Sequence, residues 1–193
     1  MSKQLRALAL VLLVAACGGE REYSAPRDLD NACRILEQRP SYQRAFRATE
    51  RRWGVPVAVQ MAIIYQESKF IGNARTPHQY ALGVIPIGRQ SSAYGYSQAL
   101  DGTWAEYQRA RGRGQRDDIN DATDFMGWYM AQTTAELGVP LNDTTNQYLA
   151  YHEGRTGFAR QSHLEKAWLM RVAQDLGERA AMYDAQLHSC RRA

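Results

Sequence analysis

Residues 56–70 read PVAVQMAIIYQESKF, and this stretch indicates how the whole chain folds. Pro56 suits the first turn of a helix, where a missing backbone N–H costs nothing. Residues 57–65 are apolar apart from Gln60, and a helix that is apolar on every side is buried. The stretch therefore predicts a central helix surrounded by the rest of the domain, with Glu67 placed where that helix leaves the core.

The position of Glu67 has consequences for its chemistry. Partial burial disfavours the charged form and the negative end of the helix dipole repels it, so both effects raise its pKa. An ion pair with Lys69 would act in the opposite direction. A carboxyl group with a raised pKa stays protonated near neutral pH, as a general acid must. On this pattern alone, a glutamate with a structural partner is the commoner explanation, so a catalytic role needs further residues in its support.

The rest of the sequence is helical in pattern, and no strand-like alternation of useful length appears. A chain of 193 residues, 45% of them apolar, has the size of one domain. We therefore expect a single all-α domain. The segment 71–96 is rich in Gly, Pro, Ser and Tyr and is longer than an ordinary connection, which predicts a functional loop. Apolar spacing and helix start and stop residues predict helices over 28–38, 41–53, 97–112, 119–138, 144–154 and 162–187.

The N-terminus has the pattern of an export signal. Two basic residues precede the apolar run 7–17, which is too short to span a bilayer. LVAAC (13–17) resembles the bacterial lipoprotein cleavage box, which implies cleavage before Cys17, lipidation of Cys17 and anchoring to a membrane. Gly18 after the cysteine resembles the signal for sorting to the outer membrane. We expect a signal peptide over 1–16, a lipidated tether over 17–27 and the folded domain over 28–193.

Once Cys17 carries lipid, two cysteines remain, Cys33 and Cys190. An even pair in an oxidising compartment predicts a disulfide that joins the start of the domain to its end. Two free buried thiols are the alternative. Closing so long a loop contributes at most about 4–5 kcal/mol in the chain-entropy model.

The charge of the chain is too small to indicate a polyanionic partner. The net charge of +4 falls to +2 without Lys3 and Arg6. The basic cluster RARGRGQR (109–116) is best explained as a solvated Gly-rich loop, so we expect no nucleic-acid partner. The histidines His78, His163 and His188 are scattered without spaced carboxylate or cysteine partners, so the sequence predicts no metal site.

Three short sequence blocks, which follow one another along the chain, favour a catalytic role for Glu67. They are QESKF (66–70), AYGYSQAL (93–100) and YLAYHEG (148–154). Together they resemble the signature blocks of the soluble lytic transglycosylase family, which has a goose-type lysozyme-like fold. The resemblance covers about residues 41–170. It implies a monomeric enzyme, without a cofactor, that cleaves peptidoglycan strands between N-acetylmuramic acid and N-acetylglucosamine and leaves a 1,6-anhydro product.

The resemblance also implies roles for single residues. Glu67 matches the sole catalytic acid and base of the family, and Ser68 matches the serine that orients this acid. Gln98 matches a glutamine that lines the sugar cleft, and Tyr151 matches a tyrosine whose hydroxyl lies close to the catalytic carboxyl. Because the C6 hydroxyl of the substrate performs the displacement, such an enzyme needs no second carboxylate, unlike ordinary glycosidases.

Several positions depart from the family pattern. His152 and Glu153 stand where Asn and often Ala are usual, and Tyr96–Ser97 replace a Leu-Met pair. We expect His152 to replace the Asn as a hydrogen-bond partner and the pair Tyr96–Ser97 to make the substrate cleft more polar. Glu153 is expected to be a solvated charge at a helix end.

Other functions and positions stay open at this stage. If Glu153 or Asp101 activates water instead, the protein is a muramidase; if the fold has lost its activity, it is a peptidoglycan-binding lipoprotein. Some tyrosines of the blocks suit sugar binding, because sugars pack their CH faces on aromatic rings. The tryptophans, Trp168 among them, are expected in the core.

Overall fold

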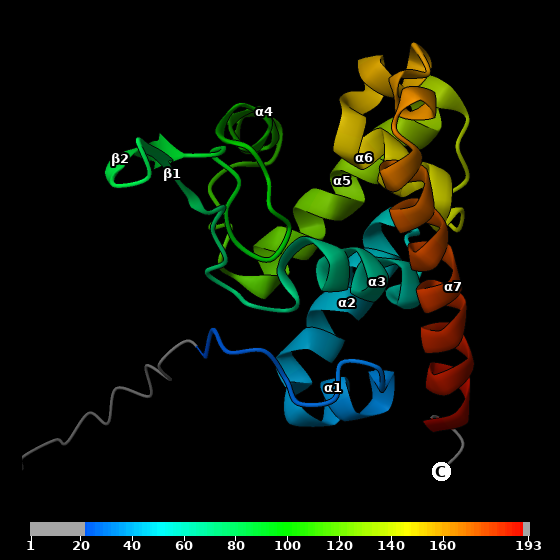
Figure 1. Cartoon of the computed structure of the whole chain (residues 1–193). Helices are drawn as coiled ribbons and strands as arrows, with labels where there is room; N and C mark the ends of the chain where they lie inside the picture. The colour runs from blue at the N-terminus through cyan, green and yellow to red at the C-terminus, as the bar shows by residue number, and fades with distance from the viewer. Residues whose placement is uncertain (1–21, 191–193) are drawn as a thin grey trace, which may run out of the picture.

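Residues 22–190 are described by a computed structural model, and seven α-helices make up most of this part of the chain (Figure 1). This confirms the expected, mostly helical fold. The helices are α1 (Ala32–Gln38), α2 (Pro40–Trp53), α3 (Val57–Ser68), α4 (Asp101–Arg111), α5 (Ile119–Leu137), α6 (Thr144–Ala159) and α7 (Ala167–Cys190); a short 3-10 helix, η1 (Ser162–Glu165), precedes α7.

Helix α3 is the predicted central helix. All of its residues from Val57 to Ile64 are buried. The only polar one, Gln60, is satisfied because its amide group donates to the carbonyl oxygens of Phe46 at 3.1 Å and Val55 at 2.8 Å. Helices α2, α6 and α7 pack against α3 (Figure 1). The end of α3 is therefore a rigid place for a side chain.

An aromatic cluster fixes α4 on α5. The rings of Trp104 and Tyr107 from α4 lie 5.3 and 5.5 Å, centroid to centroid, from the ring of Phe125 in α5. Aromatic contacts at such separations add to the stability gained from burial. Helix α5 ends as predicted, with Gly138 in the left-handed conformation.

Helix α1 and the C-terminal end of α7 lie together at one end of the molecule (Figure 1). The predicted disulfide between Cys33 and Cys190 is present, with the two Cα atoms 6.2 Å apart. Nearby, Arg179 of α7 pairs with Asp30 at 2.7 Å, and the Tyr183 hydroxyl donates to the Leu29 carbonyl at 2.5 Å. The start of the domain is thus tied to its last helix by both covalent and polar contacts.

The predicted signal peptide and Cys17 lie outside the described residues. Residues 22–27, which we assigned to the tether, contact the domain: the Tyr23 hydroxyl donates to Asp117 at 2.9 Å, and the Gly72 amide donates to the Tyr23 carbonyl at 3.0 Å. Among helices between residues 22 and 190, none has the length and apolarity needed to cross a membrane.

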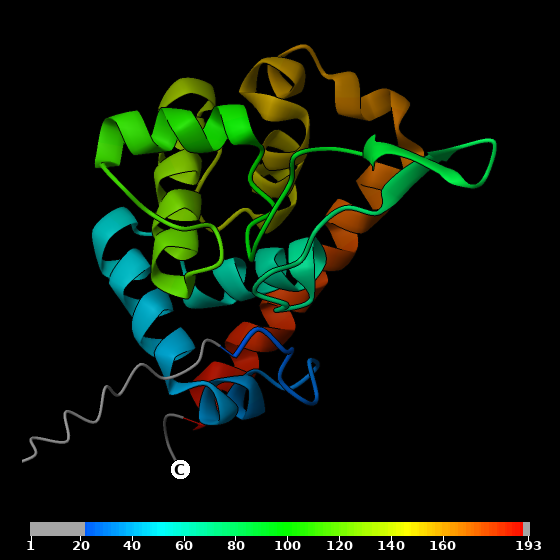
Figure 2. The ribbon, with the colours of Figure 1, turned by 90° about the vertical axis from the view of Figure 1, so that its left-hand side faces the viewer.

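The long segment 71–96 differs from our expectation, because it contains a β-hairpin. Strands β1 (His78–Ala81) and β2 (Ile85–Arg89) pair in antiparallel fashion and project from the helices (Figure 2). Apolar side chains of the hairpin lie in solvent, with Leu82 90% and Val84 76% exposed. The expectation of a chain without strands was wrong here, since an exposed two-stranded hairpin needs no buried alternating face.

Candidate active site

The end of α3 turns sharply at two residues with positive φ. Lys69 caps the helix in the left-handed conformation, and its amide donates to the Tyr65 carbonyl at 3.1 Å. Phe70 is also left-handed, and its buried ring stacks on Tyr42 with centroids 5.9 Å apart. The buried ring holds the turn against the core. Glu67, in the last turn of α3, is therefore held at the point where the helix meets the surface.

The Glu67 side chain is half-buried and forms no hydrogen bond or ion pair with another residue of the described chain. Burial raises its pKa to about 8, and the positive charge of Lys69 opposes this only in part. The direction agrees with the sequence argument. A carboxyl group in this state is protonated at neutral pH and has its hydrogen-bonding capacity free for a ligand.

Two tyrosines of α6 lie beside Glu67. Burial raises the pKa of both hydroxyls, Tyr148 and Tyr151, and the negative charge of Glu67 raises them further. The Tyr151 hydroxyl donates to the Ser97 carbonyl at 2.7 Å. The first and third sequence blocks thus meet at the acid, and the second block is attached to them through Ser97.

Gly95 and Gln98 shape the second block. Gly95 has φ of 81°, and a Cβ atom there would lie 2.1 Å from the Arg116 carbonyl oxygen, so only glycine fits. The Gln98 amide donates to the carbonyls of Ala74 at 3.0 Å and Gly95 at 2.8 Å. These hydrogen bonds from Gln98 stabilise the loop, and the Gln98 side chain also lines a neighbouring cavity.

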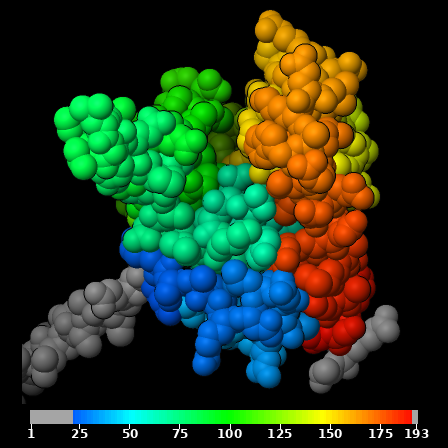
Figure 3. Space-filling view, viewed as in Figure 1, coloured from blue at the N-terminus to red at the C-terminus, as the bar shows by residue number. Residues whose placement is uncertain are grey.

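That cavity, of about 210 Å³, lies between α4 and the kinked middle of α6. In Figure 3 a hollow separates the segment around the hairpin and α4 from the segment of α6 and η1. Three of the residues predicted to bind substrate line this cavity together: Gln98, Tyr151 and His152. Its lining is Gln98, Ala99, Leu100, Thr103, Phe125, Tyr129, Tyr151, His152, Glu153 and Gly154.

The two other predicted substrate-binding residues do not face the cavity. Ser68 is buried, and its hydroxyl donates to the Ile64 carbonyl at 3.3 Å rather than to the Glu67 carboxyl group. Tyr96 is only 4% exposed, and its hydroxyl hydrogen-bonds the Tyr42 hydroxyl at 3.1 Å inside the core. The expectation that Tyr96 makes the cleft polar was therefore wrong, because residue 96 points inward from its loop.

Glu153 is not the solvated charge that we expected. Its side chain is only 4% exposed, and Lys166 donates to its two oxygens at 2.7 and 2.9 Å. Ser162 and His152 also bond to it. The hydrogen bonds from Lys166, above all, lower the pKa of Glu153 to about 2. A carboxylate held in this way positions α6 against η1, and its lone pairs are occupied, so it is poorly placed to activate water.

Trp168 also differs from our expectation of a core residue, because 51% of it is exposed. Its ring meets the ring of His152 edge-on at 5.4 Å. The sequence shows apolar spacing in this helix but does not distinguish a core position from the rim of a cleft. The Ser97 carbonyl was not indicated by any sequence signal, and Tyr148 was indicated only as one of several tyrosines of the blocks that suit sugar binding.

No group of three or more His, Cys, Asp or Glu side chains in residues 22–190 is arranged to hold a metal ion. In a comparison with known families, the family described as "Transglycosylase SLT domain" matches residues 5–190. No curated protein matches the chain.

Proposed function

The chain belongs to the transglycosylase SLT-domain family, and from this premise we propose that it is a lytic transglycosylase with Glu67 as its acid and base. Family membership implies cleavage of peptidoglycan glycan strands. The finer proposal is that the β-1,4 bond between N-acetylmuramic acid and N-acetylglucosamine breaks and that the muramic acid product closes a 1,6-anhydro ring.

The observation that carries the proposal is the state of the Glu67 carboxyl group. Its pKa of about 8 keeps it protonated at neutral pH. It donates its proton to the glycosidic oxygen as the bond from this oxygen to C1 breaks, so the leaving sugar departs as an alcohol. The resulting carboxylate takes the proton of the C6 hydroxyl, whose oxygen bonds to C1. Glu67 ends the cycle protonated, and no water is consumed.

The environment of Glu67 supports this cycle. When the pKa of an acid lies near the working pH, its protonated and deprotonated forms are close in free energy. Such a group can therefore donate a proton in one step and accept one in the next. The neighbouring hydroxyls of Tyr148 and Tyr151, whose pKa values are raised, stay protonated and neutral throughout. The intramolecular attack by the C6 oxygen removes the need for a second carboxylate, which agrees with the engagement of Glu153 by Lys166.

The test is product analysis with the Glu67→Gln variant. We expect wild-type protein to release anhydro-muropeptides from purified sacculi, and Glu67→Gln to lose at least about a thousandfold in rate while keeping its fold. Glu37→Gln, an exposed substitution on α1, is the control. Mass spectrometry separates the rival chemistry, because a muramidase product contains an added water. Full turnover by Glu67→Gln, or a product with the added water, contradicts the proposal.

We also propose that the protein works as a monomer on the outer membrane, anchored through lipid on Cys17 and facing the periplasm. The Cys33–Cys190 disulfide supports export, since disulfides persist in oxidising compartments. Fractionation of cells after metabolic labelling with a fatty acid tests the anchor. We expect label and membrane association in wild type and neither in Cys17→Ala.

A further inference from the structure

The hairpin of β1 and β2 gathers exposed apolar side chains in one place. Nine large apolar side chains within residues 22–190 are exposed, and five of these belong to residues 80–87. Neither strand packs extensively on a helix of this part of the chain (Figure 2). Contiguous apolar surface of this kind marks an interaction site. The five side chains are Tyr80, Leu82, Val84, Ile85 and Ile87.

The turn of the hairpin places a leucine where a small or polar residue is usual. Leu82 and Gly83 are its central residues, with φ of 52° and 75°, and the Val84 amide donates to the Ala81 carbonyl at 3.2 Å. Asn, Asp or Gly is preferred at both central positions of such a turn, because positive φ strains other residues. Leu82 is nevertheless the residue there, and its side chain is 90% exposed. A strained position of this kind indicates a function that requires an apolar tip.

Apolar side chains lie on both faces of the hairpin. Residues that pair across two strands point to the same face, and Tyr80 pairs with Pro86. Ala81 pairs with Ile85 on the opposite face, because adjacent residues of a strand point in opposite directions. A protein partner, or a second copy of this chain, would cover one face of so small a hairpin and leave the other in water. A lipid surface instead surrounds an inserted tip on every side.

The base of the hairpin is basic. Residues 68–100 contain Lys69, Arg75 and Arg89 but no Asp or Glu. His78 pairs with Arg89 at the end of the hairpin away from the turn, and both side chains are exposed. Cations at the base and apolar side chains at the tip match a phospholipid surface, where anionic headgroups lie above the acyl chains.

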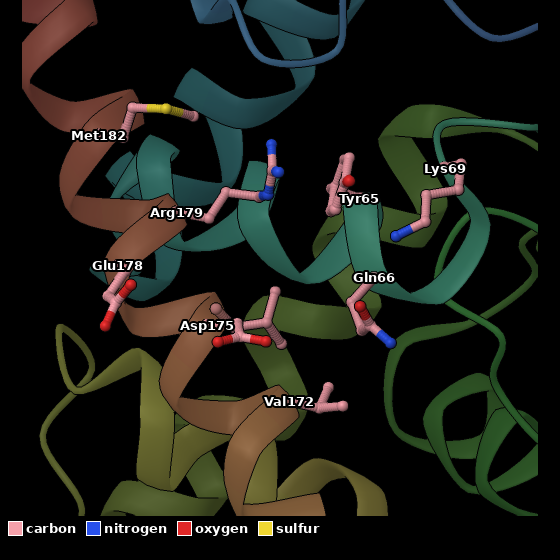
Figure 4. A pocket seen from close by; sticks show the side chains of 9 residues that line it. Tyr65, Gln66, Lys69, Val172, Asp175, Glu178, Arg179 and Met182 are labelled. Atoms are coloured by element: carbon pink, nitrogen blue, oxygen red, sulfur yellow. The ribbon is translucent and has the colours of Figure 1, made fainter. Parts of the chain in front are cut away.

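The surface between α3 and α7 shows a different composition (Figure 4). There Val172 and Met182 lie among the charged side chains of Asp175, Glu178 and Arg179, around a cavity of about 610 Å³. Interspersed charges of both signs are the ordinary composition of a surface that faces water. The hairpin lacks this mixture, so its composition is not explained by solvation.

The proposed lipid anchor brings a membrane to the side of the molecule that carries the hairpin. The first described residues and the hairpin lie on the same side, at the left of Figure 1. The Tyr23 carbonyl accepts a hydrogen bond from the amide of Gly72, which belongs to the segment that contains the hairpin. Cys17 precedes residue 22 by five residues, and five extended residues span at most about 18 Å. A lipid on Cys17 therefore keeps the bilayer close to this side.

We propose that the hairpin inserts its tip into the phospholipid surface that holds the anchor, with Leu82 and Val84 at the acyl boundary and Arg75 and Arg89 at anionic headgroups. The outer edges of a two-stranded hairpin keep unpaired backbone groups, so insertion is limited to about 5–10 Å, where water still reaches them. The hairpin and α4 border the hollow seen in Figure 3, so this contact fixes the orientation of the cleft to the membrane. The inference rests on the proposed lipid anchor and not on the chemistry of Glu67.

A fluorophore attached to the hairpin tests the insertion. Cys33 and Cys190 bond to each other and the proposed lipid occupies Cys17, so Val84→Cys supplies the free thiol of the mature lipidated protein. This protein is reconstituted into vesicles of phosphatidylethanolamine and phosphatidylglycerol that contain a lipid with a nitroxide on its acyl chain. We expect the nitroxide to quench the label on Val84→Cys and not the label on Leu164→Cys, an exposed leucine of η1 across the hollow. Equal quenching of the two labels overturns the proposal.

A charge at the tip should prevent insertion. We expect Leu82→Glu to reduce the quenching of the Val84→Cys label about tenfold, because it removes a leucine from the lipid and adds a carboxylate. Leu164→Glu, the same change outside the hairpin, should leave this quenching unchanged. Unchanged quenching in Leu82→Glu contradicts the insertion. A label that responds to added glycan strands, or to protein concentration, in place of the lipid quencher assigns the hairpin to the substrate or to a second copy and also overturns the proposal.

Turnover separates this inference from the proposed function. On short soluble glycan strands, Leu82→Glu should keep the kcat/KM of wild type, because Leu82 does not line the cavity beside Tyr151. Absence of turnover by wild type overturns the lytic transglycosylase assignment and leaves the quenching result in place. An active, lipidated protein whose Val84→Cys label is not quenched overturns the hairpin inference alone, whereas absence of lipid on Cys17 overturns the anchor and the hairpin inference together.

Discussion

At the scale of the residue, the cost of burying the Glu67 carboxyl group should be visible in the stability of the protein. Its folded pKa of about 8 lies above the ordinary value of 4.5. Between these two pH values only the folded chain holds the proton, so the free energy of unfolding falls as pH rises from 4.5 to 8 and is constant above. The Glu67→Gln variant has no carboxyl group at this position, so its free energy of unfolding does not fall in this pH range. We expect the variant to match wild type near pH 4 and to be more stable at pH 9 by up to about 5 kcal/mol, the linkage value for a pKa raised from 4.5 to about 8.

Urea denaturation of both proteins at the two pH values measures this difference. Glu37→Gln, on the exposed face of α1, should change the stability by no more than a few tenths of a kcal/mol at either pH, because the ion pair of Glu37 with Arg34 is exposed. A Glu67→Gln variant that is less stable than wild type at pH 9 would mean that the carboxylate has a stabilising partner, and the raised pKa would then be incorrect.

Lys69 should tune the acid. Its positive charge holds the pKa of Glu67 lower than burial alone would place it. Removing the charge by Lys69→Met therefore raises the pKa of Glu67. In the pH profile of kcat/KM, we expect the alkaline limb, where the protonated acid is lost, to move upward by about half a pH unit or more.

Lys166→Gln is the matched control for this shift, because Lys166 pairs with Glu153 and not with Glu67. Its alkaline limb should coincide with that of wild type. A downward movement of the limb in Lys69→Met would show that another group sets the alkaline limb.

At the scale of the element, the Glu153 cluster joins the kinked helix α6 to η1 and the start of α7. The pKa of Glu153, lowered to about 2, means that its charged form stabilises the fold. This contribution is complete above about pH 4.5 and is lost as pH falls towards 2. We expect Glu153→Gln to lower the free energy of unfolding by about 1–3 kcal/mol at pH 7, and by much less near pH 2. Glu165→Gln, an exposed change in η1, should have no such effect at either pH.

The helices that the sequence predicted well are those whose residue pattern is compatible with a single structural environment. A helix that is apolar on every side, such as α3, is stable only when it is buried in the core. Gly138 ends α5 because the residue after the helix adopts the left-handed conformation, which glycine allows. The hairpin of β1 and β2 was missed because its apolar residues, such as Leu82, face solvent. Nothing in the local sequence distinguishes them from buried ones.

The same limit applies to the site. Glu67, Gln98 and Tyr151 were predicted because three blocks resemble a family. In the structure Tyr151 lies beside Glu67, and Gln98 lines a cavity together with Tyr151. Tyr96 was expected in the cleft and lies in the core, whereas Trp168 was expected in the core and is half exposed, beside the ring of His152. Their positions depend on which way a loop and a helix face, which is decided by packing between distant segments.

At the scale of the whole molecule, stability and activity should be separable. The disulfide joins α1 to the last residue of α7, whereas the cavity lined by Gln98 and Tyr151 lies between α4 and α6, and Figure 1 shows α1 and the end of α7 at the opposite end of the molecule from α4 and α6. Cys33 and Cys190 are 157 residues apart in sequence, so their bond restricts nearly the whole unfolded chain. The double variant Cys33→Ser/Cys190→Ser should lose about 2–5 kcal/mol of the free energy of unfolding. Its kcat/KM at 25 °C should remain that of wild type, because the Arg179–Asp30 and Tyr183–Leu29 contacts still hold the ends together in the folded state.

Guanidinium denaturation and muropeptide release, measured on the same preparations, check both expectations. A folded double variant without activity would show instead that the closed ends and the cleft are coupled through α7, which carries both Cys190 and the wall that faces α3.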